Sequence, residues 1–213
     1  RDLVRKNPYA HLWQAYRYVE LGKWRNVQQV FAEQVGGDPM SARAEAARLT
    51  AHFAARLGAD TAQLADLWRQ VYQSDRDDAE AQAALVPLYR ELGKWKEYAE
   101  VYKRLIERYD EDQTTEKRAG LESLIEVYTH HLKSDQVLTD LYAQLFALDP
   151  TDDAVAELLQ EKYGKLRKWQ NVLEVLETRS DVLEGAEMSG DLSAKERRLE
   201  LLGQRAGILQ NQL

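Results

Sequence analysis

The sequence contains no cysteine and only four prolines among its 213 residues. Without cysteine the chain cannot form a disulfide, a thiolate metal site or a thiol nucleophile. Because proline is scarce and only eleven glycines occur, long helices are permitted almost everywhere. The chain also lacks an apolar run of the roughly 20 residues that a membrane-spanning helix needs, so we expect no membrane span in this segment.

Positive charge is in short supply as well. The chain carries 29 Lys and Arg against 36 Asp and Glu, a formal net charge of -7. Binding to nucleic acid depends on phosphate neutralisation by a basic face, so we expect no nucleic-acid partner. The content of 44% hydrophobic and 31% charged residues is typical of a folded, soluble chain. We favour the cytoplasm over the periplasm, and because the sequence opens with Arg1 we expect a fragment or a processed form.

Residues suited to catalysis or metal binding are few. The adjacent His130 and His131 would point roughly 100 degrees apart on a helix, which does not suit a shared metal. No phosphate-binding loop or nucleophile elbow is present. The carboxylates at 75–78 and 149–153 come at expected helix starts, where they would cap free amides rather than bind calcium. We therefore expect no catalytic residue, no metal and no cofactor.

A seven-residue phrase recurs along the chain. Residues 18–24 read YVELGKW, residues 89–95 read YRELGKW, and residues 163–169 read YGKLRKW. A degenerate copy lies around Gly58, and a further turn is expected at 131–135. Successive turns at Gly22, Gly58 and Gly93 are 36 and 35 residues apart, close to the period of about 34 known for one class of helical repeat.

Each repeat has the pattern of two helices. In the third, apolar residues at helical spacing run from Ala81 to Tyr89, Gly93 then favours a helix end, and a second apolar stripe starts at Trp95. Two helices joined by so short a turn must pack antiparallel. Pro87 lies inside the first helix, where it removes the hydrogen bond to the Ala83 carbonyl and should bend or break the helix.

With this phrase and period, residues 8–180 resemble the tetratricopeptide repeat family, and the Gly-Lys-Trp turn is similar to large bacterial members. The resemblance implies an all-α solenoid of about five antiparallel helix pairs plus a C-terminal helix, wound as a right-handed superhelix. The chain departs from the family at Val27, Tyr98 and Val172, where the family has a small residue. The expected units are 8–37, 38–74, 76–110, 112–150 and 151–184, with a terminal helix at 193–211.

Several local features refine this expectation. Asn7-Pro8 and Asp38-Pro39 are helix-start signals. Residues 185–190 are predicted to form a loop or a frayed helix end, followed by a capping box with Ser193 as N-cap and Glu196 three residues later. The last helix is expected to be either the first helix of a sixth unit or a solvating cap. Trp24, Trp95, Trp169 and Trp68 are expected to pack in the core, whereas Trp13 is a candidate for exposure.

The resemblance also implies a function. Such arrays bind a protein or peptide in a concave groove lined by the first helix of each pair. The register predicts an apolar surface in unit one, a basic one in the middle units and an acidic one in the last two units. In unit three, the corresponding positions also include Ala83 and Pro87. The candidate partner-binding residues are Tyr9, Leu12, Tyr16, Arg48, His52, Arg90, Glu122, Glu126, Glu157 and Glu161.

Alternatives remain open at this point. The acidic end would attract a basic or amine-bearing segment, or its glutamates are ordinary solvated surface. The aromatic residues of unit one would grip an apolar anchor, or meet a preceding repeat. We expect a protein-interaction scaffold without enzyme activity, with a place in a larger assembly. One alternative is a regulatory or sensor domain that binds a short signalling peptide. Another is a helical-repeat enzyme, which is disfavoured because the loops are short.

Overall fold

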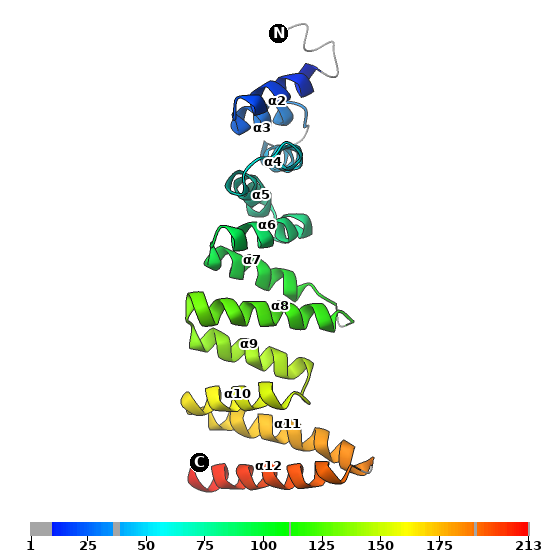
Figure 1. Ribbon diagram of the computed structural model, residues 1–213, viewed down its shortest axis with the longest axis vertical. Helices are drawn as coiled ribbons and strands as arrows, with labels where there is room; N and C mark the ends of the chain where they lie inside the picture. The colour runs from blue at the N-terminus through cyan, green and yellow to red at the C-terminus, as the bar shows by residue number, and fades with distance from the viewer. Residues whose placement is uncertain (1–9, 36–38, 111, 190, 213) are drawn as a thin grey trace. The chain divides into compact units, whose positions relative to one another are not determined.

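The computed structural model describes residues 10–35, 39–110, 112–189 and 191–212. These residues contain helices and turns and no strand. The chain divides into two compact units, Arg1–Arg108 and Tyr109–Leu213 (Figure 1). None of the helices in the described ranges is both long and apolar enough to cross a bilayer. The predicted helix-start residues Asn7, Pro8 and Asp38 and the candidate site residue Tyr9 lie outside the described residues.

The first unit is a stack of three helix pairs, each packed on the next in sequence order. The helices are α2 (Ala10–Glu20), α3 (Trp24–Ala32), α4 (Pro39–Arg56), α5 (Thr61–Ser74), α6 (Ala79–Glu91) and α7 (Trp95–Glu107). Their apolar stripes meet in a shared core, where Val27 and Ala46 are fully buried although they belong to different pairs. Burial of residues from successive pairs in one cluster is the packing expected of stacked repeats.

The second unit follows the same plan and ends in one additional helix. Its elements are α8 (Thr114–Val127), the π-helical turn η1 (Tyr128–Leu132), α9 (Asp135–Leu148), α10 (Asp153–Lys165), α11 (Trp169–Met188) and α12 (Leu192–Asn211). The core between α11 and α12 is built on Val172, Leu176 and Leu201, with Trp169 packed against them. The predicted all-α solenoid of helix pairs with a C-terminal helix is therefore confirmed, whereas the exact unit boundaries and the superhelical hand stay predictions.

The recurring phrase has a structural explanation in the turn between the two helices of a pair. After each first helix one residue takes a left-handed conformation: φ is +64° at Gly22, +74° at Gly58, +64° at Gly93, +50° at Lys133 and +53° at Arg167. In the three copies of the phrase, the next amide donates a hydrogen bond to the carbonyl of the phrase's tyrosine, at distances of 2.8 to 2.9 Å. This is the Schellman motif, which satisfies the last carbonyls of the helix.

The left-handed residue agrees with the alignment of the third copy to the other two. Arg167 takes the place of the turn glycine and has positive φ, whereas Gly164 lies within α10. Lys168 then donates to the Tyr163 carbonyl as Lys23 and Lys94 do in the other copies. In the fourth pair the first helix has one extra residue before its left-handed Lys133, and η1 absorbs this residue by a bond from the Lys133 amide to the Tyr128 carbonyl.

Two of the five turns therefore impose a left-handed conformation on a residue with a Cβ atom. We expect Arg167→Gly and Lys133→Gly each to raise the free energy of unfolding by about 0.5–1 kcal/mol, the relief of left-handed strain less the entropy cost of glycine. A urea titration followed by circular dichroism measures the change. Arg167→Ala is the control, because it keeps the Cβ atom; an equal gain from alanine would mean that the arginine side chain, rather than the backbone, was the source.

Of the two alternatives predicted for residues 185–190, the loop is wrong, since α11 continues through Gly185 to Met188. Ser193 is not the N-cap of the last helix either: Asp191 is, and its carboxylate accepts the amides of Ser193 at 2.9 Å and Ala194 at 3.3 Å. An ionised carboxylate is a stronger acceptor than a serine hydroxyl at a helix N-terminus, so the helix begins two residues earlier than the capping-box pattern indicated.

Other predictions about single residues are confirmed. Trp68 is buried, and Trp13 is 68% exposed. Trp24 and Trp169 pack against the cores of their units. Of the two outcomes predicted for Pro87, a break does not occur, because α6 is continuous from Ala79 to Glu91, and a bend stays a prediction. The proline is tolerated because it and Ala83, whose carbonyl it leaves without a helical partner, are both exposed to solvent.

Candidate functional site

The five left-handed turns provide a common origin for comparing the first helices. Two positions, ten and six residues before the turn residue, form a recurring pair on α2, α4, α6 and α10. On α8 the offsets are eleven and seven because of the residue inserted at η1. The pairs are Leu12 and Tyr16, Arg48 and His52, Ala83 and Pro87, Glu122 and Glu126, and Glu157 and Glu161. We call these ten residues the first-helix face, taken separately in each unit: six lie on α2, α4 and α6 of the first unit and four on α8 and α10 of the second.

The first-helix face is open to solvent. Nine of its ten residues are exposed, and Arg48 is half-buried. Arg90, the other candidate on α6, is also exposed. Leu12 and Tyr16 are 43% and 46% exposed, so the face in the first pair is apolar. Exposure at a fixed register in each first helix agrees with the sequence-based placement of the candidate residues, whose role in binding stays a prediction.

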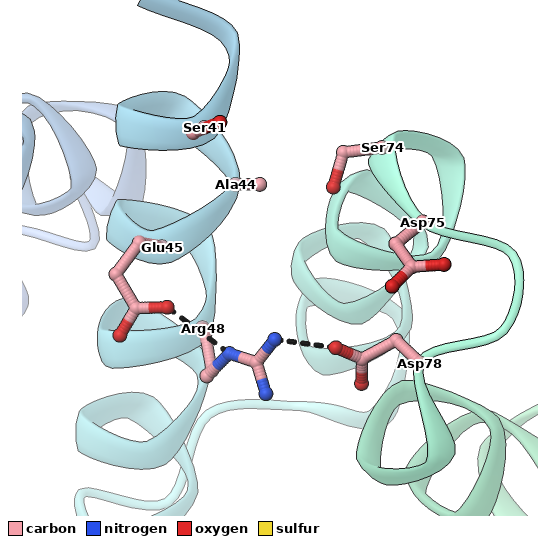
Figure 2. A pocket seen from close by; sticks show the side chains of 7 residues that line it. All are labelled: Ser41, Ala44, Glu45, Arg48, Ser74, Asp75 and Asp78. Atoms are coloured by element: carbon pink, nitrogen blue, oxygen red, sulfur yellow. Dashed lines mark hydrogen bonds and ion pairs between the residues drawn. The ribbon is translucent and has the colours of Figure 1, made fainter. Parts of the chain in front are cut away.

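Arg48 departs from the expectation of a basic surface, because its charge is already matched within the first unit. From α4 the guanidinium reaches Asp78 at 2.5 Å and Glu80 at 2.6 Å, at the start of α6, and Glu45 at 3.2 Å on its own helix. Figure 2 shows the side chain extended from α4 between Glu45 and Asp78. His52 lies 3.0 Å from the second oxygen of Glu80. Both basic residues of the face therefore tie α4 to α6.

The ion pair between Arg48 and Asp78, which we call an ion tie because it joins α4 to α6, stabilises the charged form of both side chains. Burial alone would lower the pKa of Arg48, but its hydrogen bonds with Asp78 and Glu80 outweigh burial, so the pKa is raised. Burial likewise favours a higher pKa for Asp78, but the amide of Ala81 and the Arg48 guanidinium outweigh it and hold the pKa below its usual range. Asp78 is also the N-cap of α6, accepting the Ala81 amide at 2.8 Å. One carboxylate thus serves both the helix start and the tie.

The second unit has an equivalent ion pair between an arginine of one first helix and the N-cap residue of the next. Arg118 on α8 is paired with Glu122 at 3.0 Å, with Asp149 at 3.3 Å and with Asp152, the N-cap of α10. The hydrogen bonds to Asp152 and Glu122 raise the pKa of Arg118. The Arg118 guanidinium and the Val155 amide together lower the pKa of Asp152. In each unit an arginine of one first helix therefore holds the N-cap of the next first helix, an arrangement that the sequence-based reasoning missed.

The acidic part of the face lies on α8 and α10. Glu122, Glu126, Glu157 and Glu161 are exposed. Two of them have cations on their own helix: Glu122 pairs with Arg118, and Glu161 lies 2.5 Å from Lys165, which lowers the pKa of Glu161. Glu157 has no cationic partner among the described side chains. The face is therefore acidic but partly neutralised, and its attraction for a basic segment is weaker than four unpaired carboxylates would exert.

The structure has two shallow pockets of note. One, of about 410 Å³, lies in the first unit beside Arg48 and is lined by polar side chains of α4, the end of α5 and the residues before α6 (Figure 2). The other, of about 400 Å³, lies in the second unit between η1, α9 and α10. Across the described ranges, no three His, Asp or Glu side chains lie together in an arrangement that could hold a metal ion.

Comparison with known proteins gives similarity at the level of helical folds. No protein-family model matches the chain, and no curated protein matches its sequence. Among solved structures, a crystal structure of MamA has 15% identity and a TM-score of 0.37, covering 78% of this chain and 86% of that one. The crystal structure of BtubC from P. vanneervenii has 14% identity and a TM-score of 0.37, covering 99% of this chain and 87% of that one. We rest no argument about function on similarity at this level.

Proposed function

We propose that this chain is a protein-interaction scaffold whose first-helix face binds a partner protein or peptide. The observation that carries the proposal is the exposure of the same two positions on successive first helices, where nine of the ten residues are exposed. Within each unit, such a face offers side chains at regular spacing on packed helices, which suits recognition of a segment of protein. We propose no catalytic role.

The chemistry of the face differs between the units, and this supports a division of the binding site. In the first unit, Leu12 and Tyr16 present apolar surface, and exposed aromatic residues are common anchors in protein interfaces. In the second unit the face has four carboxylates, which favour a basic or amine-bearing segment. Because Arg48 and His52 are bound to acidic residues of their own unit, they support the stack rather than a carboxylate-terminated ligand.

The acidic part can be tested by charge reversal. We expect the quadruple change of Glu122, Glu126, Glu157 and Glu161 to Lys to reduce capture of native partners by about tenfold or more, since reversing charges in a complementary interface costs several kcal/mol. The measurement is quantitative mass spectrometry of proteins retained by the immobilised chain. Circular dichroism checks that this variant and the control variant described below are folded.

A matched control separates the face from net charge. Reversing Asp140, Glu174, Asp181 and Glu196 changes the net charge equally, and these exposed residues lie outside the first-helix face. Partners lost only with the first variant support the proposal. Equal losses from both variants would show that overall charge governs capture, and partners retained by both would rule out the acidic part of the face as a binding site.

A further inference from the structure

The terminal helix α12 has two apolar faces, of which only one is covered. The covered face packs on α11 through Ala194, Leu201 and Ile208. The other face carries Leu199, Leu202, Ala206 and Leu209, at successive intervals of three, four and three residues. The three leucines are 60%, 40% and 51% exposed. We call these four residues the α12 stripe. Its spacing is that of the a and d positions of a coiled coil, unlike the polar outer face of a solvating cap.

We propose that the α12 stripe is a homodimer contact, pairing with the α12 stripe of a second copy in antiparallel orientation. The stripe is self-complementary about its midpoint at residue 204, because its members lie five and two residues to either side. A two-fold axis at that point places Leu199 opposite Leu209 of the second copy, and Leu202 opposite its Ala206. Isologous contacts of this kind are the commonest in homo-oligomers.

The composition of the stripe favours the antiparallel arrangement over a parallel one. Each antiparallel layer contains at least one leucine, whereas a parallel pair would stack Ala206 on its own copy and leave a gap. Near the midpoint the backbone is open, since a Cβ atom added at Gly203 would meet nothing within 4 Å. Small residues at the centre of a helix crossing allow the two backbones to approach closely.

The charges beside the stripe are matched within each copy. Arg198 and Arg205 flank the stripe on one side, and the two-fold axis at residue 204 brings the Arg205 side chains of the two copies near each other. Both arginines are also paired with acidic residues of α11. Arg198 lies 2.8 Å from Glu184, and Arg205 lies 3.1 Å from Glu177. The flanks of the contact are therefore close to neutral in each copy.

The contact is small, and this sets the expected affinity. The stripe spans eleven residues, about 16 Å of helix, which is less than the interface of a stable dimer, so we expect the association to be weak. Sedimentation equilibrium of the chain up to about 500 µM should show the mean mass rising with concentration from 24.6 kDa toward twice that value. We expect Leu202→Lys to weaken the association at least tenfold.

Two control variants test whether the association uses the α12 stripe or another exposed apolar surface. Met188→Lys adds the same charge at an exposed position of α11, 84% accessible, and should dimerise as the unmodified chain does. Trp13→Lys tests the apolar surface of α2 in the same way. A chain that stays monomeric throughout, or a Leu202→Lys variant that dimerises as the unmodified chain does, overturns the proposal.

The absence of cysteine allows a direct test of the register. In the double variant Leu202→Cys and Ala206→Cys, oxidation should form covalent dimers, because the two positions lie opposite each other across the axis. Either single variant should cross-link far more slowly, since each position is then displaced along the helix from its own copy. Cross-linking of the single variants at the rate of the double one would exclude this register.

Discussion

Replacing Tyr98 with alanine should lower the free energy of unfolding by about 3–5 kcal/mol, the range for removing a buried aromatic side chain. Tyr98 is 1% exposed and heads the fully buried side chains by volume. Its ring makes edge-to-face contacts with Trp95 and Tyr102, with ring centroids 6.3 and 5.2 Å away. Truncation removes the apolar transfer energy and both aromatic contacts, and it leaves a cavity between helices that cannot collapse fully.

A urea titration followed by circular dichroism measures this loss, and hydrogen exchange of the α6 and α7 amides shows where it arises. Trp13→Ala is the matched control, because it removes a larger ring that is 68% exposed and should change stability by no more than about 0.5 kcal/mol. If both substitutions destabilised the chain equally, the core of the third helix pair would not be organised around Tyr98.

The position of Tyr98 illustrates what periodicity can and cannot predict. The resemblance to tetratricopeptide repeats placed a small residue there and at the corresponding Val27 and Val172, and the chain departs from that expectation at all three. The structure buries all three, at 1%, 0% and 4% exposure. Spacing along a helix shows which positions face inward. It does not show how much room the facing helix leaves, because that depends on side chains dozens of residues away.

The turns between paired helices also show which residues can be recognised from sequence and which cannot. Gly22 and Gly93 were correctly placed at helix ends, since glycine takes positive φ at little cost. Arg167 was placed at the third turn by the alignment of the phrase alone, two residues before Trp169. Arginine itself gives no signal for a left-handed turn, so its positive φ is seen only in the structure.

The first-helix face was predicted from local register, whereas the ion ties beneath it were not. Local spacing correctly placed Asp78 at a helix start, and it predicted an open position for Arg48, which the structure has half-buried. It could not show that these two side chains meet, because their contact joins residues 30 positions apart. The sequence-based prediction therefore treated the positive charge of Arg48 as free, whereas Asp78 neutralises it.

Asp78 combines two roles, and we expect its substitutions to separate them. Asp78→Ala removes both the N-cap of α6 and the partner of Arg48, and should cost about 2–3 kcal/mol of stability, a cap plus a charge-assisted hydrogen bond. Asp78→Asn retains an oxygen for the Ala81 amide but loses the charge, so about half of that loss should remain. Asp77→Ala is the control: it removes the same charge one residue earlier, where the side chain is 82% exposed, and should be nearly neutral.

The pH dependence of stability provides an independent check on the tie. Folding lowers the pKa of Asp78 below its usual 3.8, so the unfolded chain binds a proton more readily than the folded chain does. The stability that the Asp78 carboxylate contributes is therefore complete above the usual pKa and is lost as the pH falls through the folded-state pKa. The unmodified chain should be more stable than Asp78→Asn at pH 7, and this difference should shrink as the pH is lowered below about 4. A difference that stayed constant down to pH 2 would mean that the ionised carboxylate contributes no net stability, and that Arg48 does not hold α4 to α6 through its charge.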